Sequence, residues 1–160
     1  MPNNLVMKAR DTIAAKLAEC YITIGTRRYN FMQMKDMEVK VEKQKSSVPR
    51  LGAIMLGHKA YGMEGTFSGT AHYNQSVMRQ LLVDYKNTGE DTYFEMQITN
   101  DDPTSAAGAQ TVVLYDCNTD GGILAKFDAD GEFLDEEMEG TFEDFSMPES
   151  FANLTGFLAN

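Results

Sequence analysis

The chain is 160 residues long and 42% hydrophobic, which fits one folded domain and excludes an intrinsically disordered chain. No apolar run approaches the roughly 18 residues needed to cross a membrane. The N-terminus lacks the apolar core of a signal peptide, so synthesis in the cytoplasm is expected. The formal net charge of −10 argues against tight binding of nucleic acid.

The charge is divided unevenly along the chain. Residues 1–88 carry 13 Lys and Arg against 7 Asp and Glu, whereas residues 89–160 carry one base, Lys126, against 17 acids. A basic half and an acidic half favour self-association, in which the positive region of one copy faces the negative region of the next. The same division fits two solvated faces that meet no partner, and charge alone does not separate these alternatives.

The first part of the chain predicts an N-terminal segment and a β-hairpin. Residues 1–17 have apolar side chains at weak helical spacing, so a short helix and an extended N-terminal arm both remain open. The sequence ECYITIG, residues 19–25, is rich in β-branched and aromatic residues and predicts a strand. A turn at Gly25-Thr26 then leads into a second strand, RRYNFMQM.

Two alternating strands flank a long stretch that has no sustained period. In residues 37–44 apolar side chains alternate with charged ones, so one face of that strand must meet water. Residues 66–73 alternate in the same way, and Gly69 suits a bulge or a close backbone approach. The stretch between these strands is rich in glycine and longer than an ordinary hairpin loop, and loops of this length are usually functional.

One helix is predicted, over about residues 75–87. Asn74 is a suitable N-cap and Gly89 a suitable stop, and an apolar stripe should face the core: Val77, Met78, Leu81, Leu82 and Tyr85. Short strands are predicted after the helix at TYFEMQITN, TVVLYDC, GILAKFDAD and EMEGTFEDFSM, with a turn at residues 128–132. The tail, residues 148–160, has no clear pattern. The predicted fold class is mainly β with one flanking helix.

The sequence contains no motif that predicts catalysis. The glycine-rich residues 57–76 match neither GxxxxGK[ST] nor GxGxxG. His58 and His72 lie in different segments, without a hydrolase or metalloprotease motif around them. Cys20 and Cys117 predict two reduced thiols, at least one of them buried. We therefore expect no enzyme activity, cofactor or metal.

Asp116, Asn118 and Asp120 match the first half of a calcium-binding loop. The twelfth position should be a bidentate Glu but is Phe127, and the flanking sequences predict strands where the loop requires helices. A β-hairpin turn explains the same residues, because Asp, Asn and Gly tolerate the backbone angles of turns. The turn is the preferred interpretation, and a calcium site is the alternative.

Three sequence blocks, in this order and spacing, carry a family resemblance. They are VEKQKSSVPRLGAIMLGHKAYGMEGTFSGTAHYN, YFEMQITNDDPTSAAGAQTVVLYDC and EGTFEDFSMPESF. Together they resemble the tail-tube proteins of contractile phages and phage-tail-like particles, in particular the tube protein of PBSX-type defective prophages. The resemblance extends roughly from Ala9 to Phe151.

The resemblance implies a single tail-tube domain over residues 1–160, a β-sandwich or barrel-like fold. Six copies would form a ring, and rings would stack into a hollow tube within a contractile sheath, with baseplate and tape-measure proteins as further partners. The location would be the virion tail or a phage-tail-like particle. Residues 45–62 would project as a hairpin and pack on the next ring, through Lys45, Arg50, Leu51, Met55, His58, Lys59 and Tyr61.

The resemblance also implies which strands line the tube. The inner strands would be about residues 37–44 and 64–73, with TVVLYDC and its partner as further candidates. A strand with one apolar and one charged face suits a barrel wall around a water-filled bore. The residues expected to face the bore are Glu38, Lys40, Glu42, Thr66, Ser68, Thr70 and His72. A bore that passes DNA should be acidic on balance, with Lys40 paired with its glutamate neighbours across strands.

An alternative function is a small β-barrel binding module that holds a ligand or calcium. Such a site needs a pocket with a few convergent polar groups. The chain has no Trp, and its sequence contains no cluster of such groups. These features favour the structural role over the binding module.

Overall fold

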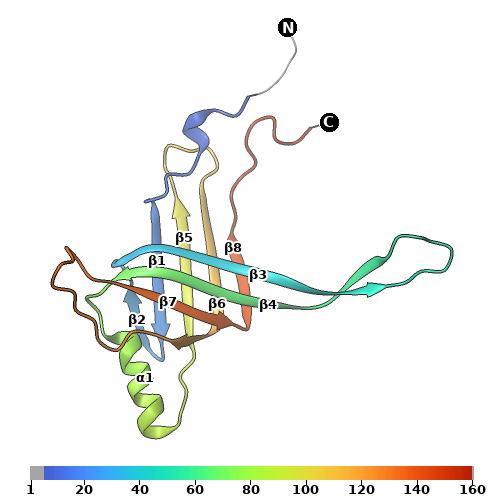
Figure 1. The fold of residues 1–160 in the computed structure, drawn as a ribbon. Helices are drawn as coiled ribbons and strands as arrows, with labels where there is room; N and C mark the ends of the chain where they lie inside the picture. Colours follow the sequence, from blue (N-terminus) through green and yellow to red (C-terminus); the bar gives the residue numbers. More distant parts are fainter. Residues whose placement is uncertain (1–5, 160) are drawn as a thin grey trace.

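The computed structural model describes residues 6–159; residues 1–5 of the expected N-terminal arm and residue 160 lie outside the described part. The fold is mainly β, with one α-helix and one long β-hairpin, which confirms the predicted fold class (Figure 1). Hydrogen bonds join the strands in the order β2-β1-β5-β6-β7-β4-β3, and β8 pairs with β6. No helix among residues 6–159 is long and apolar enough to cross a membrane.

The strands lie in two layers that cross steeply in Figure 1. Sheet A contains β1 (Ala18–Ile24), β2 (Arg27–Asn30), β5 (Phe94–Asp101), β8 (Asp144–Glu149) and the first part of β6 (Ala109–Gly121). Sheet B contains β3 (Met34–Val48), β4 (Gly57–His72), β7 (Asp135–Phe142) and the end of β6. This two-layer arrangement buries one face of each sheet.

β6 belongs to both sheets because it bends at Asp116. Asp116 is the only described non-glycine residue with a positive φ, 52°. Before the bend β6 pairs with β5 and β8, and from Asn118 onward it pairs with β7. The sequence prediction of a hairpin turn here was wrong: the Asp and Asn residues that tolerate turn angles instead let one strand change sheets.

The core lies between the two sheets and consists of alternate side chains from both. Ile22, Met96 and Leu114 come from sheet A and are fully buried. Phe67 of β4 meets Phe94 of β5 edge to face, with ring centroids 6.2 Å apart, and so connects the layers. The alternation predicted for residues 66–73 is confirmed, because Phe67, Gly69 and Ala71 are all buried.

Helix α1 (Val77–Thr88) covers one end of sheet B. Three members of the predicted apolar stripe, Val77, Met78 and Leu81, pack on the core, whereas Tyr85 is exposed. Gly89 ends the helix as predicted, with φ +73° and its N–H donating to the Tyr85 carbonyl. Asn74 is not the N-cap: the helix begins two residues later than predicted, after Ser76.

The Arg79 side chain fastens α1 to the sheet. Its guanidinium pairs with the half-buried carboxylate of Glu136 on β7 and lies 4.3 Å from the centre of the Tyr73 ring. It also donates to the carbonyl of Ile123 at 3.5 Å. Because both charged groups are largely shielded from water, the pair holds the helix on β7, and the bond to Ile123 adds the start of the loop that precedes β7.

The N-terminal segment is extended apart from a short 3-10 turn, η1 (Ala9–Asp11). Asp102 accepts hydrogen bonds from the backbone N–H groups of Ala14 and Thr104, which lowers the pKa of its carboxyl. Ser105 donates to the carbonyl of Asp11 at 2.8 Å. These bonds fix the segment to the loop between β5 and β6, so the arm alternative describes it better than the helix.

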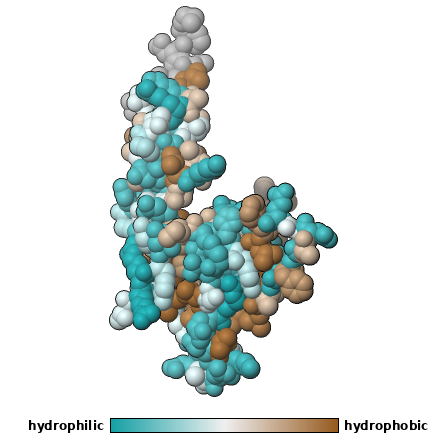
Figure 2. Space-filling model, turned by 90° about the vertical axis from the view of Figure 1, so that its left-hand side faces the viewer, coloured by the Kyte–Doolittle hydropathy of each residue, from teal (hydrophilic) through white to brown (hydrophobic). Residues whose placement is uncertain are grey.

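Residues 122–134 form a loop, although GILAKFDAD was predicted to be a strand. Leu124 and Phe127 are exposed, and no strand pairs with this segment. The predicted turn at residues 128–132 is confirmed, since the Gly131 N–H donates to the Asp128 carbonyl at 3.3 Å. Figure 2 views the molecule from the end of sheet B where this loop lies, and hydrophobic side chains stand there among hydrophilic ones.

Replacing Gly140 by Ala is expected to destabilise the fold by about 1–3 kcal/mol or more. A Cβ at Gly140 would lie 2.2 Å from the backbone oxygen of Asn118 and 2.4 Å from the Phe67 ring. The backbone oxygen cannot rotate away, so β6 and β7 must separate. Gly62→Ala is the matched control, because nothing lies within 4 Å of its added Cβ. Chemical denaturation would measure both, and equal stabilities would contradict the packing described.

The two cysteines should be inert in the folded protein. Both are buried free thiols, and burial raises the pKa of Cys20 to about 11 and that of Cys117 to about 12. At pH 8 neither forms the reactive thiolate. A colorimetric thiol reagent should therefore label both only after denaturation, while an added surface cysteine, Ala53→Cys, labels at once. Rapid labelling of the unchanged chain at pH 8 would refute this.

Candidate assembly surfaces

The face of sheet B that points away from sheet A is polar and exposed. All the residues predicted to line a bore lie on this face, from two adjacent strands: Glu38, Lys40 and Glu42 on β3, and Thr66, Ser68, Thr70 and His72 on β4. Glu38 is directly opposite Ser68, and Lys40 is opposite Thr66. The structure therefore brings the predicted set together on one surface, which we call the polar face.

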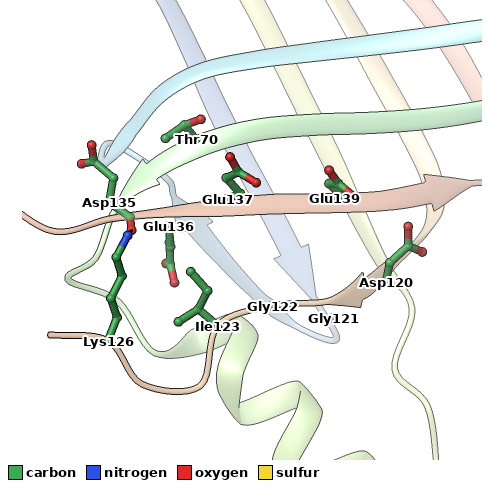
Figure 3. A pocket seen from close by; sticks show the side chains of 10 residues that line it. All are labelled: Thr70, Asp120, Gly121, Gly122, Ile123, Lys126, Asp135, Glu136, Glu137 and Glu139. Atoms are coloured by element: carbon green, nitrogen blue, oxygen red, sulfur yellow. The ribbon is translucent and has the colours of Figure 1, made fainter. Parts of the chain in front are cut away.

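β7 adds carboxylates to the polar face that the sequence prediction missed. Glu137 pairs with Thr70 and Glu139 pairs with Ser68, so both glutamates share the polar face. Figure 3 shows them on the opposite side of β7 from Glu136. The alternating sequence DEEMEGTF could have predicted that these glutamates point to water, because the residues that alternate with them, Met138, Gly140 and Phe142, are buried. The segment TVVLYDC lies in sheet A with Leu114 and Cys117 in the core, and its contribution to a bore stays a prediction.

The polar face is acidic on balance. Its central lysine, Lys40, lies 3.1 Å from Glu38, and both are well exposed. This pair forms along β3, not across strands as predicted, since the residues opposite Lys40 and Glu38 are uncharged. Apart from the Lys35–Asp135 pair beside His72 at one end, the other charged side chains on the face are carboxylates, namely Asp36, Glu42, Glu64, Glu137 and Glu139.

A network around Asp135 closes one end of the polar face. The ammonium group of Lys35 donates to Asp135 at 2.8 Å and lowers the pKa of its carboxyl, and His72 lies 3.4 Å away. Beside this network is a depression of about 570 Å³ lined by Thr70, Asp120, Glu137 and Glu139, among others (Figure 3). It is open and acidic, and its carboxylates come from the end of β6 and from β7.

The calcium-loop residues do not form a metal site. Asp116 lies at the bend of β6, and Asn118 and Asp120 follow it on the strand, where Asn118 donates to Asp91. Phe127, the twelfth position of the pattern, is six residues beyond the end of β6 and exposed. Within residues 6–159 no three His, Cys, Asp or Glu side chains are grouped to hold a metal ion.

The second surface is the hairpin arm, residues 45–62, which extends well beyond the rest of sheet B (Figure 1). The stretch between the two predicted strands, which has no sustained period in the sequence, is mostly β-strand. β3 continues to Val48, β4 begins at Gly57, and these two residues are paired. The tip of the arm is residues 49–56, where Arg50 donates to the Met55 carbonyl at 3.2 Å. The arm rises from the same two strands that form the polar face.

The arm combines positive charge with exposed aliphatic side chains. Within residues 45–59 the charged side chains are Lys45, Arg50 and Lys59, and there is no Asp or Glu. Every residue predicted to make the inter-ring contact is exposed: Lys45, Arg50, Leu51, Met55, His58, Lys59 and Tyr61. Sequence reasoning missed Ile54, which is fully exposed at the tip. Exposed aliphatic groups of this size are typical of a protein interface.

Residues 5–149 match the family model for phage tail tube protein. The chain is 37% identical over 149 residues to the phage-like element PBSX protein XkdM of Bacillus subtilis, covering 93% of this chain and 99% of that protein. A solved Bacillus subtilis protein is also 37% identical, covers 89% of this chain and 99% of its own, and superposes with a TM-score of 0.50.

The fold also resembles a more distant solved protein. A chain in the cryo-EM structure of the anti-feeding prophage baseplate superposes with a TM-score of 0.65, covering 89% of this chain and 97% of its own. The two sequences are only 11% identical, so this likeness concerns the fold alone. The resemblance to the PBSX-type tube protein is confirmed by the family match and the 37% identity together. The chain belongs to the phage tail tube protein family, and its role is that of a structural tail tube protein.

Proposed function

We propose that six copies of this chain form a ring and that rings stack head to tail into the hollow inner tube of a contractile tail. The observation that carries this proposal is the division of β3 and β4 into a polar face and a hairpin arm. The role is structural and not enzymatic. The partners are other copies, a sheath protein, and baseplate and tape-measure proteins, in a virion tail or phage-tail-like particle assembled in a bacterial host.

The polar face is the proposed wall of the bore. Its opposite side packs on the core, so the strands are fixed while one complete face meets water. β3 is the outermost strand of sheet B, and its free edge is open to a strand from a neighbouring copy. Lateral pairing of this kind would join the polar faces of six copies into a continuous wall. The baseplate with a related fold was six-fold symmetrised, which is consistent with this number.

The hairpin arm is the proposed contact with the next ring. A contact between an arm and a different surface of another copy is heterologous, and such contacts build filaments when they do not close on themselves. The arm has few contacts with the rest of its own chain, since its pairing is confined to β3 and β4. Its exposed aliphatic side chains therefore lose water only when another molecule covers them.

Removing the arm should prevent tube growth without unfolding the protein. Gln44 and Gly62 are paired across β3 and β4, so residues 45–61 can be replaced by Asn-Gly as a two-residue hairpin turn. The core residues remain, and the thermal unfolding midpoint should change little. Negative-stain microscopy should show no long tubes. Tubes of normal length from this variant would contradict the assignment of the arm.

The bore of the assembled tube should be negative on balance. Carboxylates from three strands outnumber the lysines of the polar face, where Lys40 is already paired with Glu38 and Lys35 with Asp135. Carboxylates repel DNA phosphates over about 8 Å at physiological salt, so the wall should not hold a passing strand. Cryo-EM of the tube would locate Glu38, Glu42, Glu137 and Glu139. A mainly positive bore, or burial of these glutamates between subunits, would refute the proposal.

A further inference from the structure

We propose that the tip of the hairpin arm in one copy docks on the loop of residues 122–134 in another copy, an inference that rests on the head-to-tail stacking proposed above. We call this segment the aromatic loop, because Phe127 and Phe133 are its most exposed large side chains. The proposal identifies the receptor for the arm by position, by shape and by charge.

The aromatic loop presents apolar side chains that its own chain does not cover. Phe127 is 92% exposed and Phe133 is 83% exposed, although both are large aromatic groups that fold interiors normally bury. Between them lies a hollow of about 270 Å³, which Leu134 and Ala129 also line. The arm tip carries matching groups, because Leu51 and Ile54 are both fully exposed.

The loop is held in place although it has no strand. The Tyr73 hydroxyl donates to the Leu124 carbonyl at 3.4 Å, and the Lys126 ammonium donates to the Asp135 carbonyl at 3.0 Å. The Asp128 side chain accepts the N–H of Asp130 at 3.1 Å and so fixes the turn between the two phenylalanines. A receptor formed in advance in this way loses little conformational entropy on binding.

Charge distinguishes this loop from the cleft between the two terminal segments. The aromatic loop carries three acids, Asp128, Asp130 and Glu132, against one base, Lys126, while residues 45–59 carry three bases and no acid. A second apolar cleft lies between the two terminal segments, but its two bases, Lys8 and Arg10, outnumber its one acid, Asp11, so its net charge would repel the arm. The aromatic loop therefore offers both apolar contact and opposite charge.

The arm and the aromatic loop lie at opposite ends of sheet B. β4 runs from Gly57, at the arm, to His72, which pairs with Asp135 directly after the loop. Its 16 residues span about 50 Å. Figure 1 shows the arm on the right and the loop on the left of the same sheet. An arm that leaves one copy along the strand direction thus meets the loop end of the next copy first, and the contact repeats without closing.

A third apolar surface is the groove at the base of the arm, between β4, β7 and the start of β8, which includes Thr141 and Phe145. It also carries carboxylates, Glu143 and Asp144. This groove lies at the same end of β4 as the arm, where Gly65 pairs with Phe142. Docking there would bring the arm ends of two copies together, which favours a closed pair over a growing filament.

Cysteine cross-linking tests which surface receives the arm. Ala53→Cys places a thiol in the arm tip and Ala129→Cys places one in the hollow, and both sites are exposed. The native cysteines are buried and do not compete. The double variant, assembled and treated with a short bismaleimide, should give a ladder of dimers, trimers and longer chains on a denaturing gel. Each single variant should give no ladder.

Two matched variants separate the possible outcomes. Ala53→Cys with Ala106→Cys tests the terminal cleft, and Ala53→Cys with Thr141→Cys tests the groove at the base of the arm. Suppose that the preparations still form tubes, and that one of these controls gives a ladder whereas the Ala129 variant does not. This result would refute the proposed docking site but not the proposed tube. If the unchanged chain forms no rings or tubes at high concentration, the proposed tube itself fails, and the docking fails with it.

Charge reversal gives an independent test that does not depend on cysteines. Lys45→Glu/Lys59→Glu should raise the protein concentration needed for tubes by about tenfold or more, and so should Asp130→Lys/Glu132→Lys. Combining all four changes in one chain should recover most of the loss, since the opposite charges meet again. Reversal of two acids at the end of α1, Asp84→Lys/Glu90→Lys, should have little effect. A combined variant no better than either reversal alone would refute the docking.

Discussion

The bend of β6 at Asp116 is the constraint on which the rest of the fold depends. A straight strand would extend one sheet, whereas the positive φ of Asp116 turns the chain so that β6 pairs first with β5 and β8 and then with β7. The two sheets therefore share a strand and must cross. Gly140 is needed at that crossing, because any side chain there would strike the backbone of β6 and the ring of Phe67.

The crossing also determines which surfaces remain for assembly. Sheet A and helix α1 cover one face of sheet B, so the apolar side chains of β4 end in the core and the opposite side chains stay in water. Beyond Gly65 the strands leave the core, and Val41 and Met63 become exposed. β3 and β4 thus change from a wall packed on one side to a free hairpin, with a register shift between Gln44 and Lys45 at the base of the arm.

Sequence periodicity predicted the parts of the fold in which one face is buried. It identified the strands around Phe67, the apolar stripe of α1 and the helix stop at Gly89, because each is set by local burial or by a local backbone conformation. Periodicity failed where the structure of a segment depends on pairing with a strand that is distant in the sequence. GILAKFDAD has the composition of a strand but finds no partner, and the Asp and Asn residues after Tyr115 bend a strand instead of ending it. The carboxylates of β7 joined the polar face only once the register with β4 was known.

The fold redistributes the charge of the basic and acidic halves of the sequence over sheet B. The acidic half does not form a separate acidic region, because β7 inserts beside β4 and places Glu137 and Glu139 on a face begun by the basic half. The arm keeps a net positive charge, because residues 45–59 contain no acid and extend away from the other strands. The sheet is therefore positive at one end and acidic along its face and at its other end. Two copies with this polarity attract when they lie head to tail and repel when like ends meet, so the charge distribution favours open, one-directional growth over a closed pair.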